Sequence, residues 1–366
     1  MPEQSKVIIR CLVYNHEPYL RDCLEGFVMQ QTNFPFKAVV HDDCSTDNSA
    51  AIIREYAEKY PHIIEPIYET ENQYCKQDGS LNRIMDAATL DRSPYLAYCE
   101  GDDYWTDPHK LQKQVDYMDT HPECSMTCTH AEILTPNGVL DDNTLSKTGW
   151  IRPLKTGILK TEDIIEKGGE NIYIHTCTML LRPSIIPELR RTIKSCSVGD
   201  YPLQIMSTLK GCVYYLHEKT ACYRYGFGKS WTGQLESNIK EGNISLNIKQ
   251  SIMQMLTCMN KYSQSKYNTI FKQTQAQIAL QNLHNFPTER KNILKRLGWA
   301  LKYSYIAEAV KSPQNSIITR IQFIIMRTLA WPYYPFLNTI KYMFSPWHPA
   351  VIMARFIGKW NSIFQK

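Results

Sequence analysis

Carboxylates recur at three points of the sequence where a strand is expected to end or a helix to begin. Asp42 and Asp43 follow one apolar run. Glu100 and Asp102 follow a second apolar run and have a glycine between them. Asp200 precedes a helical stretch. A strand-end carboxylate can accept hydrogen bonds from a nucleobase or a ribose hydroxyl. A carboxylate pair suits a divalent metal that also holds substrate phosphates. A separate carboxylate in the same crevice is a candidate general base.

Each of these acids also has a structural alternative. Residues 45–47 are expected to cap the helix that follows them, residues 100–103 can be a loop of helix-capping acids, and Asp200 can be an N-cap. In extended backbone, positions 100 and 102 point the same way, and Gly101 between them lets a ligand approach the backbone. For Asp43 we favour ligand binding, because two adjacent strand-end carboxylates repel each other unless something pairs them.

Strands and helices alternate in the first hundred residues, which places these acids at one edge of a sheet. The expected strands are 6–14, 36–41, 63–68 and 95–99, and the expected helices are 18–30, 47–60 and 80–88. This order predicts a parallel, doubly wound sheet whose ligand crevice lies at the carboxyl ends of the strands.

The pattern loosens after that. Asp107-Pro108 is a helix start that runs to about Thr120; further strands are expected at 125–134, 172–181 and 211–216, and helices dominate from about residue 232. We therefore predict a first domain over residues 1–235. Residues 236–366 form a mainly helical extension.

Three sequence blocks in this order resemble the inverting, nucleotide-sugar-dependent glycosyltransferases of family 2, whose fold is the mixed α/β GT-A fold. The blocks are Val13-Tyr14-Asn15, the stretch from Val39 to Asp47, and the stretch from Ala97 to Trp105. Their order and spacing carry the resemblance, which covers roughly residues 5–233. It implies that residues 1–235 are the catalytic domain, with a nucleotide-sugar half at about 1–105 and an acceptor half at about 106–235.

The resemblance implies a role for each matching residue. Asp43 would bind the base or ribose, Glu100 the ribose, and Asp102 a divalent metal, Mn²⁺ or Mg²⁺, with Asp103 supporting the site. Gly199-Asp200 resembles the family's base motif, so Asp200 would be the catalytic base. The remaining residues expected to bind the nucleotide sugar are Tyr14, Asn15, Glu17, Gly101, Arg224 and Lys229, the last two in a loop, residues 223–231, that would close over the diphosphate.

Three positions depart from the family pattern. Glu100 replaces the commoner Asp, Cys44 stands where Gly is usual, and Gly226 occupies the place where related sequences often carry a metal-binding His. The third metal contact is therefore unassigned. The Gln-x-x-Arg-Trp segment of processive synthases does not follow, which favours transfer of a single sugar.

The resemblance implies a nucleoside diphosphate sugar as donor and a glycan or polyprenyl-linked glycan as acceptor. Trp105, His175, Thr176 and Trp231 are the candidates for acceptor contacts, although Trp105 can simply pack and His175 can be an interior histidine. A sugar nucleotidyltransferase is an alternative, but it would carry a Gly-rich phosphate loop after the first strand. A sugar-nucleotide-binding protein without transferase activity is another.

Charge divides the chain into two unlike parts. The 366 residues carry a net charge of +5, but from residue 289 there are twelve Lys or Arg against two Asp or Glu. This basic, aromatic tail is expected either to contact an anionic membrane surface or to pack on the catalytic domain or a second subunit of a homo-oligomer, and nucleic acid is not an expected partner. Without a visible signal sequence or twenty-residue apolar span, we expect a cytoplasmic protein, peripheral on the inner face of the membrane if the tail binds lipid.

Overall fold

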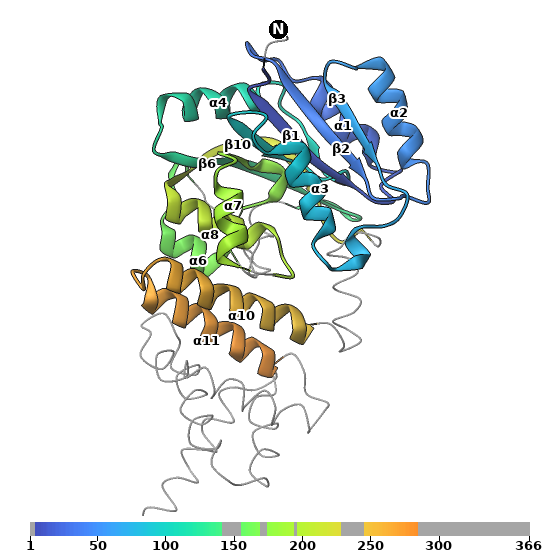
Figure 1. The fold of residues 1–366 in the computed structure, drawn as a ribbon. Coiled ribbons are helices and arrows are strands. Elements are labelled where there is room, and N and C mark those ends of the chain that lie inside the picture. The colour runs from blue at the N-terminus through green and yellow to red at the C-terminus, as the bar shows by residue number, and fades with distance from the viewer. Residues whose placement is uncertain (1–3, 141–154, 169–173, 194–195, 228–244, 285–366) are drawn as a thin grey trace, which may run out of the picture. The chain divides into compact units, whose positions relative to one another are not determined.

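The computed structural model describes residues 4–140, 155–168, 174–193, 196–227 and 245–284 (Figure 1). The chain divides into two compact units, Met1–Tyr267 and Asn268–Lys366. In the second unit the described element is helix α11, Asn268–His284. The predicted domain boundary near residue 235 lies outside the described residues and stays a prediction, as does the role of the basic tail.

Four parallel strands form the first part of the sheet, as the alternating pattern predicts. They are β1 (Val7–Val13), β2 (Phe36–Asp42), β3 (Ile64–Tyr68) and β4 (Tyr95–Tyr98). β1 lies between β2 and β4, with Val13 opposite Asp42 and Arg10 opposite Tyr98. Because all four strands run the same way, the acids that follow β2 and β4 reach the same edge of the sheet.

The rest of the sheet is mixed. β9 (Leu180–Leu181) runs antiparallel between β4 and β6 (Cys124–Thr135), β6 pairs in parallel with β10 (Cys212–Arg224), and β5 (Tyr104–Trp105) pairs antiparallel with β10. Two short strands, β7 (Gly138–Leu140) and β8 (Gly157–Ile158), pair with β6 and β10. The predicted strand over 172–181 is wrong for most of its length: Thr176–Thr178 form the short 3₁₀ helix η2, and within the described part of that range only Leu180 and Leu181 are strand.

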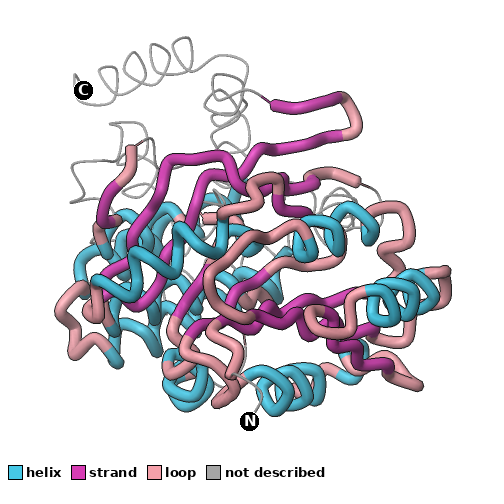
Figure 2. Tube along the Cα trace, turned by 90° about the horizontal axis from the view of Figure 1, so that it is seen from above, coloured by secondary structure: helices cyan, strands magenta, loops and turns pink. Residues whose placement is uncertain are grey.

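Helices cover both faces of the sheet (Figure 2). On one face, α1 (Leu20–Val28), α2 (Ser49–Lys59) and α4 (Lys110–Thr120) share a hydrophobic core with the alternate residues Val7, Ile9, Cys11 and Val13 of β1. On the other face, α3 (Ser80–Thr89) and α7 (Ile185–Thr192) meet β1 through polar side chains: Nη1 of Arg10 lies 2.8 Å from Oδ1 of Asp86, and Arg190 binds the same carboxylate.

The remaining helices of the first unit are α6 (Thr161–Lys167), α8 (Asp200–Lys210) and α10 (Ser245–Tyr262), with the 3₁₀ helix η1 at Tyr74–Lys76. α8 packs between α6, α7 and the strands β6 and β10. α10 joins this group through the Tyr262 hydroxyl, which donates to Oε1 of Glu188 on α7 at 3.1 Å. Within the described ranges, no helix combines the length and apolarity that crossing a membrane requires.

Candidate active site

The ends of β1, β2 and β4 lie side by side and bring the first two acidic segments together. The Asp43 amide donates to the Val13 carbonyl at 2.9 Å, and the Gly101 amide donates to the Leu12 carbonyl at 2.9 Å. The loops after β2 and β4 are thus both tied to the end of the central strand β1. This confirms that the parallel order of the strands gathers these acids at one edge.

Hydrogen bonds join the loop after β1 to the loop after β2. The Ser45 hydroxyl accepts the Asn15 amide at 2.9 Å, and Oδ2 of Asp47 accepts the Glu17 amide at 3.0 Å. In return, Oδ1 of Asn15 accepts the Thr46 amide at 2.7 Å. The expectation that residues 45–47 cap the following helix is confirmed for Asp47, whose Oδ1 accepts the amide of Ser49, the first residue of α2 (Ser49–Lys59), at 2.9 Å. Ser45 and Asp47 also brace the neighbouring loop. Contact of Asn15 and Glu17 with a nucleotide sugar stays a prediction.

Cys44 shows why glycine is usual at its position. Its φ is 63°, in the left-handed region where a side chain is disfavoured. The cysteine therefore keeps the backbone course of the loop at the cost of local strain.

The two adjacent aspartates at the end of β2 have different surroundings. Both carboxylate oxygens of Asp43 accept backbone amides of the loop after β3, Oδ1 from Gln73 at 2.7 Å and Oδ2 from Tyr74 at 3.0 Å. Asp42 is equally buried, yet its Oδ1 has no hydrogen-bond partner among the described residues. From the sequence we favoured Asp43 for ligand binding. In the structure, the carboxylate oxygen of this pair that lacks a hydrogen-bond partner among the described residues is Oδ1 of Asp42. Two exposed tyrosines lie next to this segment: the amide of Tyr74 donates to Asp43, and Tyr14 follows Val13, whose carbonyl accepts the Asp43 amide.

Residues 100–103, here called the acid loop, form a turn in which the Asp103 amide donates to the Glu100 carbonyl at 3.1 Å. The extended backbone assumed from the sequence is therefore wrong. Gly101 is required because a Cβ there would lie 2.7 Å from Nδ1 of His16 and 2.9 Å from Cγ2 of Val13. The close approach that this glycine permits is to the protein's own His16.

Arg224 holds the acid loop from the end of β10. Its amide donates to Oδ1 of Asp103 at 2.9 Å, its Nη1 donates to the Asp102 carbonyl at 2.7 Å, and its Nη2 binds Asp22. The guanidinium also stacks on the Tyr104 ring, 4.5 Å from the centroid, and only 6% of the residue is exposed. These contacts make Arg224 a support of the loop, and neutralisation of a diphosphate by it stays a prediction.

Asp200 meets the acid loop from a separate part of the fold. It is the first residue of α8, whose N-cap is Gly199, so the N-cap alternative for Asp200 does not hold. Its Oδ1 accepts the amide of Tyr201 at 2.8 Å. The negative charge of Asp200 contributes to the raised pKa of Glu100, after loss of hydration and the charge of Asp102. Residues 100 and 200 therefore lie within electrostatic range of each other.

Three carboxyl groups of the site, those of Asp200, Asp103 and Glu100, have raised pKa values. Burial raises the pKa of Asp200, and burial followed by the charge of Asp102 raises that of Asp103 well above its usual range. The pKa of Glu100 rises to about 8 through loss of hydration and the charges of Asp102 and Asp200. Because the Glu100 side chain remains open to water, we give the two neighbouring charges more weight than lost hydration.

The acceptor candidates are mostly interior. Trp105 is 2% exposed, and its Nε1 donates to the Cys177 carbonyl at 2.8 Å, so this ring packs rather than faces solvent. His175 is 7% exposed and stacks on Tyr223 at 4.7 Å between centroids. Thr176 is half-buried. Lys229 and Trp231 lie outside the described residues.

The predicted metal ligand is Asp102, with Glu100 expected to face the ribose. Among the residues that the structure describes, no three His, Cys, Asp or Glu side chains form a metal-ligating group. Gly226, at the position where relatives often carry His, has a φ of 76° and supplies no ligand. Two protein carboxylates are nevertheless enough for a Mg²⁺-type ion that takes its other ligands from substrate phosphates and water.

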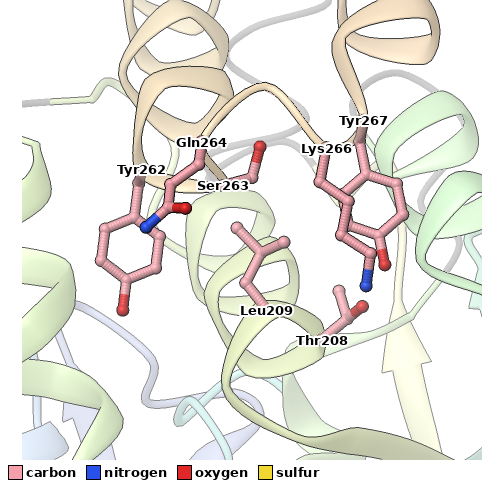
Figure 3. A pocket seen from close by; sticks show the side chains of 7 residues that line it. All are labelled: Thr208, Leu209, Tyr262, Ser263, Gln264, Lys266 and Tyr267. Atoms are coloured by element: carbon pink, nitrogen blue, oxygen red, sulfur yellow. The ribbon is translucent and has the colours of Figure 1, made fainter.

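A pocket of about 240 Å³ opens at the far end of α8, where Figure 3 shows Thr208 and Leu209 below the turn that follows α10. Its seven lining residues are Thr208, Leu209, Tyr262, Ser263, Gln264, Lys266 and Tyr267. None of them is an acid, a histidine or a cysteine, so this pocket has no group that could act as a general base near neutral pH.

Sequence reasoning missed three residues of the site. Asp42 was visible as the neighbour of Asp43, but nothing in the sequence distinguished the two. His16 and Asp22 carry no sequence signal, because their contacts with Gly101 and Arg224 join residues 85 and 202 positions apart.

Comparison with known proteins identifies relatives for part of the chain. Residues 9–187 match the family model described as Glycosyl transferase family 2. An uncharacterized protein of Mycobacterium tuberculosis is 39% identical over 153 residues, 42% of this chain and 42% of that protein. The putative teichuronic acid biosynthesis glycosyltransferase TuaG of Bacillus subtilis is 28% identical over 125 residues, 34% of this chain and 46% of that protein. This chain thus spans less than half the length of either relative.

A solved structure shares the fold. Residues 1–349 of S. aureus TarS in complex with UDP-GlcNAc superimpose with a TM-score of 0.58 at 14% identity, over 89% of this chain and 88% of that one. The likeness identifies the mixed sheet flanked by helices as the GT-A fold.

Proposed function

The chain belongs to glycosyl transferase family 2, and on that basis we propose that it transfers one sugar from a nucleoside diphosphate sugar to a hydroxyl group of a glycan or lipid-linked glycan, with inversion. The observation that carries the proposal is that Asp200 lies within electrostatic range of Glu100, although the two belong to segments a hundred residues apart. One segment follows the parallel strands where nucleotides bind in such sheets, and the other supplies a lone carboxylate.

Asp200 acts as the base in this proposal. It takes the proton from the acceptor hydroxyl while that oxygen attacks the anomeric carbon and the bond to the nucleoside diphosphate breaks. Its raised pKa makes it a stronger base than an ordinary aspartate, and its ionised form is the active one. A single displacement from the face opposite the leaving group inverts the configuration.

Glu100 and Asp102 fit a divalent metal, Mn²⁺ or Mg²⁺. Both offer hard oxygen atoms, and the raised pKa of Glu100 reflects negative charge that a cation would offset. When bound, the ion supplies positive charge beside the departing diphosphate. Arg224 keeps Asp102 in place through its backbone carbonyl.

The donor and the setting are narrower proposals. TarS, which has the same fold, was solved with UDP-GlcNAc, so UDP-sugars are the first donors to test. TuaG is named for teichuronic acid biosynthesis, which favours a role in bacterial cell-surface polysaccharide. The basic extension from residue 289 supports contact with an anionic membrane. Flotation of the full chain with anionic vesicles, but not with neutral ones, is the expected result.

Asp200→Asn tests the function. We expect transfer to be lost while thermal stabilisation by UDP and Mn²⁺ persists, because the amide cannot accept the acceptor proton but leaves the nucleotide site intact. Asp116→Asn is the control, since Asp116 is an exposed residue of α4 that binds Gln112. Loss of transfer and nucleotide binding together in Asp200→Asn would contradict its role as base. Nucleotide binding without transfer in the unaltered chain would favour a binding protein.

A further inference from the structure

A lysine is fully enclosed behind the acid loop. Lys110, the first residue of α4, is 0% exposed, whereas lysine is almost never completely buried without a partner. Its Nζ donates to Oε1 of Gln114 at 2.6 Å and lies 4.3 Å from the centroid of the Trp105 ring. The ammonium group thus has one amide and one aromatic face as its partners, in a place where an unneutralised charge is expensive.

Both partners of this lysine bind the same short segment, η2. Nε1 of Trp105 donates to the Cys177 carbonyl at 2.8 Å, and Nε2 of Gln114 donates to the Thr178 carbonyl at 2.9 Å. Gln114 reaches β6 as well, through Oγ1 of Thr127 at 3.2 Å. Lys110 therefore fixes the two side chains that hold η2 in place.

The same segment touches the acid loop. The Cys177 thiol and the Asp103 carboxyl group are near enough that each affects the pKa of the other, and Trp105 itself follows that loop by two residues. The backbone of His175 belongs to the same turn, since its carbonyl accepts the Thr178 amide at 3.0 Å. One side of η2 is thus anchored to α4 and the other to the acid loop.

We propose that Lys110 is a positioning residue for sugar transfer: by holding Trp105 and Gln114 it sets the place of η2 relative to the acid loop. The proposal rests on the proposed function and adds to it a residue that touches no substrate. Displacement of η2 would move Asp103 and the segment around His175 and Thr176, and misplacement by about 1 Å can lower a rate by on the order of 100-fold.

If the role of Lys110 were purely structural, a different result would be expected for the turnover number. Replacing a buried charge with an apolar residue of similar length is often neutral or stabilising. Lys110→Met is therefore expected to fold and to melt no earlier than the unaltered chain. If Lys110 only filled space, the turnover number of the folded variant would not change.

The matched control lies one turn further along α4. Lys113 is partly exposed and forms surface ion pairs with Asp107 and Glu218 at 2.8 and 2.5 Å. Lys113→Met removes the same group from the same helix without touching η2. We expect it to transfer at the unaltered rate.

The experiment measures kcat and the donor KM for the full chain, Lys110→Met and Lys113→Met, using the donor and acceptor on which the unaltered chain is active. We expect kcat to fall by on the order of tenfold or more in Lys110→Met, and by a larger factor than the donor KM rises, because η2 and Asp103 are displaced whereas Asp43 stays held by the loop after β3. An unaltered kcat in a folded Lys110→Met chain would overturn the proposal. No transfer by the unaltered chain with any donor would instead remove the proposed function.

A second variant covers the case in which Lys110→Met does not fold. Burial lowers the pKa of Lys110 to about 8, against the opposing influence of the groups that face it, Cys99, Cys177, Cys128 and Asp107. The cation is therefore lost as pH rises through about 8, and kcat should fall there. Gln114→Glu gives the ammonium a carboxylate partner but removes the amide that donates to the Thr178 carbonyl, so kcat should be lower at every pH and its fall should move to higher pH. A pH profile identical to that of the unaltered chain would overturn the proposal.

Discussion

Gly101→Ala is the sharpest test of how the acid loop is held. An added Cβ would lie 2.7 Å from Nδ1 of His16, 2.9 Å from Cγ2 of Val13 and 3.3 Å from Cδ1 of Leu20. The first two distances are shorter than real Cβ contacts, so the loop or its neighbours must move. Overpacking of this kind costs about 1–3 kcal/mol of folding free energy.

The activity should fall more than the stability. Gly101 directly precedes Asp102, so any movement of the loop that relieves the clash also displaces the proposed metal ligand. A displacement of about 1 Å can lower a rate by on the order of 100-fold. Urea unfolding measures the first effect, and Mn²⁺-dependent hydrolysis of the donor measures the second.

Two controls isolate the steric cause. Gly199→Ala places the same methyl group beside Asp200, where no atom lies within 4 Å, so its unfolding free energy should stay near that of the unaltered chain. His16→Ala should partly restore Gly101→Ala, with a coupling of about 0.5–3 kcal/mol in the double-mutant cycle. Equal stability of the two glycine variants, or strictly additive effects of Gly101→Ala and His16→Ala, would refute the steric argument.

Three further outcomes follow from the same geometry. Asp43→Ala leaves two backbone amides of the loop after β3 without acceptors, at about 1–3 kcal/mol each, and urea unfolding should show Asp43→Asn, which keeps one oxygen, to be milder. Asp103 holds its proton in the folded chain at pH values where the unfolded chain has lost it, so the free energy of unfolding falls as pH rises from the ordinary aspartate pKa towards the raised one. Asp103→Asn should flatten that slope in unfolding curves measured across pH. Arg224→Ala removes the donor to the Asp102 carbonyl, and we expect a loss of about 1.5–3 kcal/mol in urea unfolding. Arg21→Ala breaks only an exposed ion pair and should change the midpoint little, so equal effects of the two arginines would contradict the buried role of Arg224.

The sequence was sufficient to predict the strand ends that form the site. The expected strands 36–41 and 63–68 differ from β2 and β3 by one residue at an end, because apolar, β-branched runs bounded by polar residues are a local signal. Parallel topology then allowed the relative positions of the strand ends to be predicted as well. Once consecutive strands alternate with helices, their carboxyl ends must meet, so residues 43 and 100 could be placed together without coordinates.

Pairing between distant segments could not be predicted. β5 and β9 have two residues each, too few for any periodicity, and they exist because β10, β4 and β6 offer edges to them. The difference in hydrogen bonding between Asp42 and Asp43 also arises from contacts between distant segments. It depends on the amides of Gln73 and Tyr74, which lie thirty residues further along the chain.

The electrostatics of the site support an ion-dependent working state. Glu100, Asp103 and Asp200 all have raised pKa values, so the folded chain holds several carboxyl groups where ionisation is disfavoured. The nearby cations, Arg10 and Arg224, each pair with another carboxylate already. Asp103 has a structural partner in the amide of Arg224, so its place in the fold does not depend on an ion. A divalent ion bound beside Glu100 would offset the negative charge of Asp102 and Asp200, which is the electrostatic reason why we propose a metal at this site.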